Sequence, residues 1–395
     1  MPANAQPSVP LWMIAREWSR IGVTGFGGPP AHIKLLRQLC VERNEWLSAE
    51  EFEDGIAATS LLPGPASTQL AIFCAWRLAG PLGALVGGAC FIVPGLIIIL
   101  ALSVLFLAHS PPAWVRGAAA GAGAAVPAVA VSAAISLVPA SWQRAGQATL
   151  ARARWLVYVA AGGVAANLAG QFLVAVLLAC GLLEWLVSRR PGPGGLRPGR
   201  PRPGGPAMLM PLAGKAVTAG VVGSLAWVAV KVGALSFGGG FVIIPLMQHD
   251  AVLTYHWMTT TQFLSAVALG QVTPGPVVQT VAVVGYAAAG LPGGVLAAFI
   301  AFAPSFAFVL GGGPHFDKFR QSPAARAFLA GSGPAAIGAI AGAAVTLGLG
   351  LTQFWQVGVL AAAVVWLVLL RRGVVGGILA AAAAGVIVAL AGGLS

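Results

Sequence analysis

The sequence predicts an all-α polytopic membrane protein with two inverted-topology repeats of about five transmembrane spans each, which contain broken or re-entrant helices. Three observations predict this class: the apolar composition, a duplication within the sequence, and the different placement of basic residues in the two halves. Hydrophobic residues make up 58% of the 395 residues, and charged residues only 8%. That charged share is about a third of what a soluble domain carries, so a soluble globular core of this size is excluded.

Apolar runs such as Gly80 to Ala108 and Val374 to Leu394 are long enough to cross a bilayer, which needs about 20 apolar residues. The formal net charge is +12, but the basic residues lie in short loops between apolar runs, as is typical of cytoplasmic loops. We therefore expect the lipid bilayer, and no nucleic acid, as a partner. The four cysteines form no CxxC pair, so we expect no disulfide framework, metal site or cofactor. Residues 1–10 lack the features of a cleavable signal peptide.

The duplication appears when the sequence is shifted against itself by 211 residues, which aligns Arg20 to Pro94 with Lys231 to Ser305 without a gap. The matched positions are Gly22 with Gly233, Phe26-Gly27-Gly28 with Phe237-Gly238-Gly239, Trp46 with Trp257, Phe52 with Phe263, Pro63-Gly64-Pro65 with Pro274-Gly275-Pro276, and Pro81 with Pro292. Two rare tripeptides and a tryptophan at one offset indicate an internal repeat. We expect one repeat in residues 1–187 and the other in residues 207–395.

Residues 188–206 between the repeats are rich in Pro and Gly and contain five arginines, so we expect a flexible cytoplasmic linker; a patch that binds lipid headgroups is the alternative. The apolar stretch from Trp155 to Val187 is long enough for two short spans, and arginines flank both of its ends. In the corresponding stretch from Phe354 to Leu394, Arg371-Arg372 lies at the tip instead. If all these arginines are cytoplasmic, the repeats have opposite topology.

Each Pro-Gly-Pro motif interrupts an apolar run, because proline removes a backbone donor and glycine permits unusual dihedral angles. We expect Pro65 and Pro276 in the first turn of the helix that follows. Such a helix start offers free N–H groups and a positive dipole end, with Ser67, Thr68 and Gln69 or Gln279 and Thr280 as further donors. Two of these ends near mid-membrane suit an anion. The alternative is a pair of proline kinks that ease helix packing.

The Phe-Gly-Gly motifs allow close approach of backbone to backbone or ligand, and we expect them to form the wall opposite the helix ends. Lys231 lies inside an apolar run at the place that matches Arg20; a functional site and snorkelling to the interface are equally good interpretations. The predicted substrate-binding residues are Phe26, Gly27, Gly28, Pro63, Gly64, Pro65, Ser67, Thr68, Gln69, Lys231, Phe237, Gly238, Gly239, Gln271, Thr273, Pro274, Gly275, Pro276 and Gln279. No catalytic residue is predicted.

An acidic cluster formed by Glu50, Glu51, Glu53 and Asp54 precedes the first break. We expect it to cap a helix that begins after Ser48, with proton coupling as the alternative. The histidines at positions 32, 249 and 256 show no metal-ligand spacing and are interpreted as interfacial polar residues.

The segments FGGPPAHI, RNEWLSAEEF and LLPGPASTQLA, with their second-half counterparts, resemble the chromate ion transporter family in its long, two-domain form. The resemblance covers about residues 12–350. It implies a multi-pass carrier in the bacterial inner membrane that exports chromate, driven by the membrane potential or a proton gradient, with site roles for both motif pairs and Gln69. Many members have glutamates where this chain has Ala66 and Gln271, so a carboxylate for proton coupling is missing at those positions.

The leading hypothesis is therefore secondary transport of a small oxyanion, chromate first and sulfate or molybdate as related substrates. An anion channel would also use helix ends and cationic residues, and it remains open, as does a homodimer. An intramembrane enzyme is disfavoured because the apolar runs contain no His/Asp or HExxH constellation.

Overall fold

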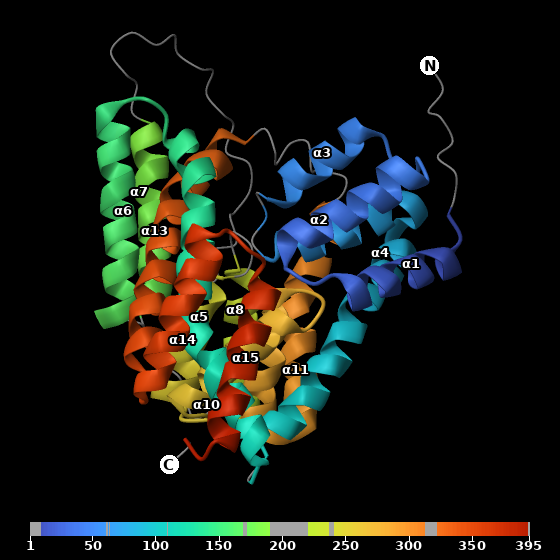
Figure 1. Ribbon diagram of the computed structural model, residues 1–395. Helices are drawn as coiled ribbons and strands as arrows, with labels where there is room; N and C mark the ends of the chain where they lie inside the picture. The colour runs from blue at the N-terminus through green and yellow to red at the C-terminus, as the bar shows by residue number, and fades with distance from the viewer. Residues whose placement is uncertain are drawn as a thin grey trace, which may run out of the picture.

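The computed structural model describes residues 9–60, 62, 64–108, 110–168, 172–189, 220–236, 241–312 and 322–393, and every regular element in these ranges is helical (Figure 1). Most of the predicted linker, all of Phe237-Gly238-Gly239, and Pro63 lie outside the described residues. The prediction of an all-α protein is confirmed. The last helix of the first half continues to Ser188, so the helical part extends one residue beyond the predicted boundary at 187.

The first half begins with a helix, a short helical segment beside the Phe-Gly-Gly loop, and a helix that precedes the first break. Its elements are α1 (Leu11–Thr24), α2 (Pro29–Arg37), the π-helix η1 (Gln38–Arg43), α3 (Ala49–Thr59), α4 (Ala66–Phe106), α5 (Ala113–Ala145), α6 (Thr149–Leu168) and α7 (Leu173–Ser188). Ser48 and Glu51 form a capping box at the start of α3, which confirms the predicted helix start after Ser48.

The second half repeats this order. Its elements are α8 (Val221–Ala234), α9 (Ile243–Gln248), the π-helix η3 (His249–Thr254), α10 (Thr260–Val272), the 3-10 turn η4 (Val277–Gln279), α11 (Thr280–Gly312), α13 (Pro323–Leu349), α14 (Phe354–Val364), the π-helix η6 (Val365–Leu369) and α15 (Val374–Leu390). The π-helices η1 and η3, and the capping boxes before α3 and α10, recur at the offset of 211 that the sequence suggested.

Beyond the Pro-Gly-Pro motifs the offset between the halves is 210, so the gap-free alignment was wrong there. The irregular residues Ala79 and Gly80 inside α4 correspond to Ala289 and Gly290 inside α11. One residue is missing from the second copy directly after its Pro-Gly-Pro, where the chain forms the 3-10 turn η4, which uses fewer residues per turn than an α-helix. Consequently Gln69 corresponds to Gln279, Gly95 to Ser305, and Pro81 to Leu291 rather than to Pro292.

Both α4 and α11 are helical hairpins that fold back at these irregular residues. A side-chain carbon added to Gly83 would lie 2.3 Å from the Ala75 carbonyl oxygen, and one added to Gly293 would lie 2.3 Å from that of Gly285. Residues on the two sides of each turn are thus in backbone contact. The short arm of each hairpin follows a Pro-Gly-Pro break, which supports the predicted broken helices.

The two halves exchange their terminal helices. The pair α6 and α7 of the first half packs on α13 of the second, and α14 and α15 of the second half pack on α5 of the first. Glycines allow these contacts: a Cβ at Gly162 would lie 1.8 Å from the Ala335 carbonyl oxygen, and one at Gly117 would lie 2.4 Å from that of Gly385. Small residues permit such close helix approach in membranes. The halves therefore form one interlocked body.

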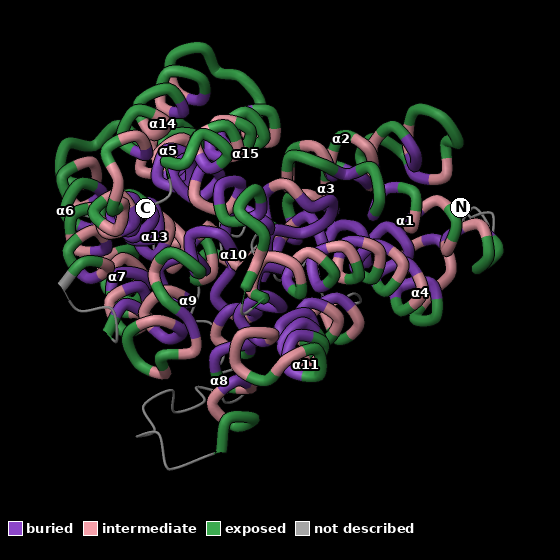
Figure 2. Tube along the Cα trace, turned by 60° about the horizontal axis from the view of Figure 1, so that its bottom comes forward, coloured by how far each residue is buried: buried purple, intermediate pink, exposed green. Residues whose placement is uncertain are grey.

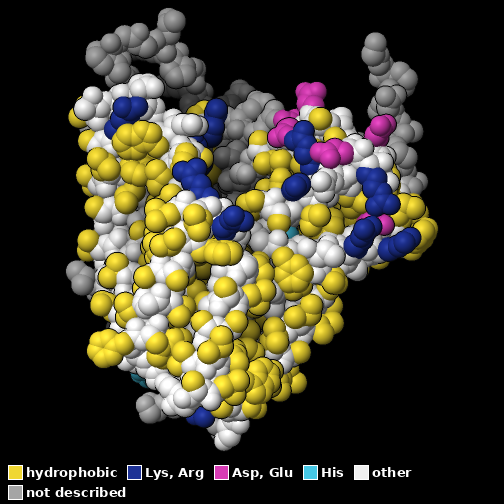
Figure 3. Space-filling model, viewed as in Figure 1, with side chains coloured by type: hydrophobic (Ala, Val, Ile, Leu, Met, Phe, Trp, Pro, Cys, Tyr) yellow, Lys and Arg dark blue, Asp and Glu magenta, His cyan; other side chains and the backbone are white. Residues whose placement is uncertain are grey.

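Within the described ranges, four helices are long and apolar enough to span a membrane, and four shorter helices are also apolar, by length and composition. Buried residues gather where α8, α10 and α11 meet, while the outer helices expose many large apolar side chains (Figure 2). In Figure 3 the Lys and Arg side chains gather mainly in the upper part of the molecule, and the rest of this face is largely apolar. These features fit a polytopic membrane protein.

Candidate functional site

Each Pro-Gly-Pro motif separates two helices, as predicted. Proline at the end of each motif lies one position before the helix rather than in its first turn: Pro65 is the N-cap of α4 and Pro276 the N-cap of η4, both with extended ψ angles. The extended ψ angle places each proline outside the helix, and the chain becomes helical one residue later. Gly64 has a φ of 122° and Gly275 a φ of 100°, so both motifs need glycine at the centre.

The first break lies against the second half of the chain. A side-chain carbon at Gly64 would be 2.6 Å from Gln69 Nε2 and 3.4 Å from both the Gly233 carbonyl oxygen and Ser305 Oγ. Gly233 lies on α8 and Ser305 on the long arm of α11. Ser67, Thr68 and Gln69 in the first turns of α4 are all buried. The predicted donors thus lie at a buried helix start that the second half of the chain covers.

The second break makes the reciprocal contact with the first half. The Gly275 N–H donates to the Gly25 carbonyl oxygen at 3.1 Å. A carbon added to Gly95 would lie 2.2 Å from the Pro274 carbonyl oxygen and 2.6 Å from Gln279 Oε1. Gln279 Nε2 donates to the Ile92 carbonyl oxygen at 2.7 Å. The Gly275 N–H and the side-chain N–H of Gln279 are therefore held by protein.

The Phe-Gly-Gly loop of the first half also contacts the second break. A carbon on Gly28 would lie 3.6 Å from Val277 Cγ2, so the loop lies next to the break of the other half, and its role as a wall of the site stays a prediction. Phe26 itself is 46% exposed, and its ring is directed outward rather than into a buried site. Gly27 and Gly28 both have positive φ, which explains the glycines in this motif.

His32 connects the first Phe-Gly-Gly loop to the first helix start, so its interpretation as an interfacial residue was wrong. The ring is fully buried, with Nε2 2.9 Å from the Gly25 carbonyl oxygen and Nδ1 3.2 Å from Ser67 Oγ. A carbonyl only accepts, so Nε2–H donates and Nδ1 accepts from Ser67. The Ser67 hydroxyl is therefore engaged by His32 in this arrangement.

His32 lies on α2, outside the candidate spans, and burial lowers its pKa to about 4, although its hydrogen bond to Gly25 opposes that shift. In the unfolded chain its pKa is near 6.5, so between pH 6.5 and 4 only the unfolded state binds this proton. We expect the folded protein to lose up to about 3 kcal/mol as the pH falls through this window. Melting curves in detergent at pH 7.5, 6.5 and 5 will show a smaller loss for His32→Gln; equal losses would contradict the role of His32.

Five buried polar atoms have no hydrogen-bond partner among the described residues. They are Thr68 Oγ1, Ser236 Oγ, Gln271 Nε2, Gln279 Oε1 and Ser305 Oγ. Buried polar groups are normally paired, and an unpaired one costs about 1–3 kcal/mol. Thr273 and Thr280 differ, because their hydroxyls bond to backbone carbonyls of Leu269 and Val277 at 2.8 Å. The unpaired set is a candidate for ligand contact.

A cavity of about 340 Å³ opens beside the first break. Pro29 and Pro30 at the start of α2 and Ala66 at the start of α4 line it, together with residues of α5, α13 and the segments before α4 and α9: Ser60, Ser136, Leu137, Ala140, Ser141, Arg144, Phe241, Val242, Leu329, Ser332, Gly333, Ala336 and Ile337. Arg144 is a cation in this wall. In the sequence, Arg144 is one of the arginines that flank the apolar stretch from Trp155 to Val187, and no local motif links it to the break.

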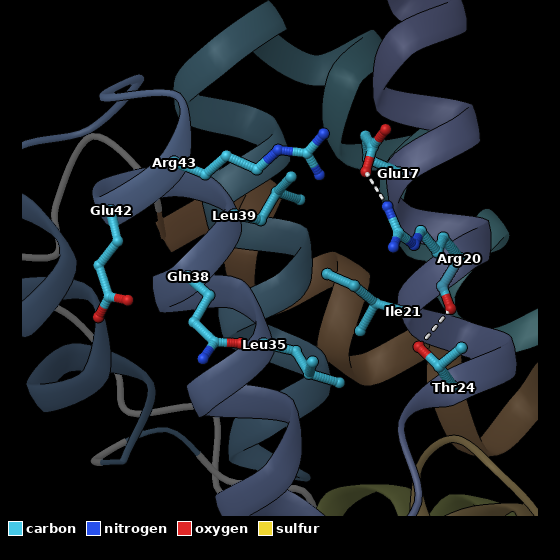
Figure 4. Close-up of a pocket in the computed structure, with 9 residues that line it drawn as sticks. All are labelled: Glu17, Arg20, Ile21, Thr24, Leu35, Gln38, Leu39, Glu42 and Arg43. Atoms are coloured by element: carbon cyan, nitrogen blue, oxygen red, sulfur yellow. Dashed lines mark hydrogen bonds and ion pairs between the residues drawn. The ribbon is translucent and has the colours of Figure 1, made fainter.

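Lys231 is partly buried and its ammonium forms an ion pair with Asp250 at 2.5 Å. Its predicted role in substrate binding stays a prediction. At the equivalent place of the first half, Arg20 lines a pocket of about 490 Å³ with Leu39, Arg43 and six other residues. Figure 4 shows Arg20 and Arg43 at one end of this pocket beside Glu17. Leu39 stands where the second half has Asp250, so the first half lacks this pair.

The sequence profile of the family described as chromate transporter matches residues 12–185 and 223–389. A chromate transport protein of Cupriavidus metallidurans is 34% identical over 87% of this chain and 84% of its own length. A probable chromate transport protein of Synechococcus elongatus is 30% identical over 87% of this chain and 86% of its own length. A chromate transport protein of Pseudomonas aeruginosa is 29% identical over 83% of this chain and 79% of its own length. No solved structure was found to match the chain.

Proposed function

The chain belongs to the chromate transporter family, and from this premise we propose that it is a secondary transporter that exports chromate across the inner membrane. The observation that carries the proposal is the pair of buried breaks, each of which presents a helix start or a glycine turn to the opposite half. Helix starts offer N–H groups and positive dipole ends, which suit an oxyanion without a metal or cofactor. Its relatives are transporters rather than enzymes.

The route from the membrane surface to the first break would pass through the cavity that Arg144 lines. Pro29 and Pro30, next to Gly28, and Ala66, next to Pro65, all line that cavity. A cationic side chain at the mouth would raise the local concentration of a dianion. Arg144 donates only one of its groups to protein in the described contacts, from Nε to the Ala140 carbonyl oxygen at 3.0 Å.

Opposite orientation of the two repeats is part of this proposal. Two observations support it. The α5–α6 connection lies at the upper edge of Figure 1, so α6 begins there. Arg154 near the start of α6 pairs with Glu184 near the end of α7 at 2.8 Å, so α7 ends at the same edge. The equivalent last helix of the second half, α15, runs to the C-terminus at the lower edge. Inverted repeats around a central site are typical of carriers that work by alternating access.

Uptake of labelled chromate into inside-out vesicles that contain this chain tests the proposal. We expect saturable uptake that depends on an imposed membrane potential or pH gradient, and that empty vesicles lack. Equal accumulation in empty vesicles would overturn the proposal. Competition of excess sulfate or molybdate with chromate uptake tests whether a related tetrahedral anion is the substrate. A unitary conductance in planar bilayers would favour a channel.

A further inference from the structure

The two breaks are not equivalent, because Ser305 stands at the first break where the second break has Gly95. Both residues lie one position after a proline in the long arm of their hairpin, Pro304 in α11 and Pro94 in α4. At Gly95 the missing side chain lets the Pro274 carbonyl oxygen and Gln279 Oε1 approach closely. At Ser305 a side chain occupies this place, and its hydroxyl oxygen is directed at the site that a side chain on Gly64 would fill.

Ser305 is fully buried, and its hydroxyl has no hydrogen-bond partner among the described residues. A serine in a membrane helix normally satisfies its hydroxyl by bonding back to the preceding turn. Ser103, which lies in the long arm of α4, does this: it is equally buried and donates to the Ile99 carbonyl oxygen at 2.7 Å. The Ser305 hydroxyl is therefore a buried donor without an acceptor among the described residues. Leaving it unpaired costs folding free energy, and packing alone does not explain that cost.

The donor faces the start of α4. Ser305 Oγ lies 3.4 Å from the position that a Cβ of Gly64 would take, and α4 begins two residues after Gly64. Thr68 in the first turn of α4 carries a second buried hydroxyl without a partner. An unpaired hydroxyl of the second half thus lies beside the positive end of the short arm of α4, whose first turn carries a second one.

On the basis of the proposed function, we propose that Ser305 is a substrate-contacting residue: its hydroxyl donates a hydrogen bond to an oxygen of the bound oxyanion at the first break. In this arrangement the first break binds the anion, and the second break serves mainly to hold the halves together. A tetrahedral oxyanion fits this role because it accepts hydrogen bonds at every oxygen, so it can take the Ser305 Oγ–H together with N–H groups at the start of α4.

Chromate uptake by Ser305→Ala in inside-out vesicles tests the inference. A hydrogen bond to a charged group contributes about 1.5–3 kcal/mol, so we expect KM for chromate to rise roughly tenfold or more with a smaller change in the maximal rate. Ser305→Thr, which keeps a hydroxyl, should recover much of the affinity. Ser305→Cys, of similar size but with a weak donor, should behave like Ser305→Ala.

Ser103→Ala is the matched control, since it removes an equally buried hydroxyl that bonds within its own helix. Its KM should stay within about twofold of that of the unaltered protein, a margin well below the expected loss of a charged hydrogen bond. Unchanged KM in folded Ser305→Ala and Ser305→Cys would overturn the inference and leave the proposed function standing. Absence of saturable uptake by the unaltered protein would overturn both.

Discussion

Alanine at Gly64 will reduce chromate transport at least tenfold while most of the protein still folds, because the added methyl group enters the first break. Gly64 has a φ of 122°, and a residue with a side chain in this region costs about 1–3 kcal/mol. The new carbon would also lie 2.6 Å from Gln69 Nε2, closer than any ordinary contact. Gln69 must therefore move, and the start of α4 loses its present geometry.

Gly80→Ala separates the effect on the site from the effect on the backbone. Gly80 also has a positive φ, of 61°, but an added carbon there meets no atom within 4 Å. Both variants should lower the melting temperature in detergent. Only Gly64→Ala should lower chromate uptake per folded molecule, as measured by size-exclusion chromatography and vesicle assays. Equal transport by the two variants would show that the first break does not bind the substrate.

Leucine at position 250 will destabilise the protein by about 3–5 kcal/mol, which is the cost of leaving one member of a buried ion pair without its partner. Among the residues that the structure describes, Asp250 is the one buried carboxylate, and Lys231 is only 13% exposed. The ammonium is also 5.5 Å from the Trp227 ring centroid, a cation–π contact that offsets only part of the lost ion pair. Asp250→Leu therefore leaves a cation in a site that water reaches poorly.

The double variant Lys231→Met with Asp250→Leu should recover most of this loss, because a buried pair can be replaced by apolar side chains at little cost. The first half already has leucine, Leu39, at the position of Asp250. Thermal melting of the two single variants and the double variant forms a double-mutant cycle that measures the coupling. If the double variant is as unstable as Asp250→Leu, the pair is not what stabilises this region.

Chromate transport by the stable double variant then tests whether Lys231 contributes to substrate binding, as the sequence predicts. Lost transport in a folded double variant would support that role. Full transport would assign Lys231 to the ion pair alone.

The class of the protein and its duplicated architecture follow from the sequence because they depend on local chemistry. Apolar runs, a capping box at Ser48, and Pro-Gly-Pro motifs determine where helices begin and stop whatever packs around them. The breaks, the hairpin of two helices between Trp155 and Val187, and the helix start after Ser48 were predicted for this reason. The family was likewise predicted from the motifs, and the comparisons confirm it.

The pairing of elements that are distant in sequence could not be predicted in this way. No local pattern shows that α6 packs on α13, or that Gly64 meets Ser305 and Gly275 meets Gly25. The one-residue difference between the copies was hidden because Pro292 mimics Pro81 at the wrong offset. His32 was misread for the same reason: its burial comes from Gly25, Ser67 and Phe91, which converge only in the folded chain.

The sequence by itself thus determined a helical membrane protein with two similar halves and two breaks, since composition, repeats and backbone-breaking residues act locally. Tertiary structure alone decided that the breaks differ. At Gly95 the absence of a side chain lets the Pro274 carbonyl oxygen and Gln279 Oε1 approach, whereas the equivalent Ser305 places a buried hydroxyl, unpaired among the described residues, beside Gly64. That distinction depends on which residues face each other, and only packing brings them together.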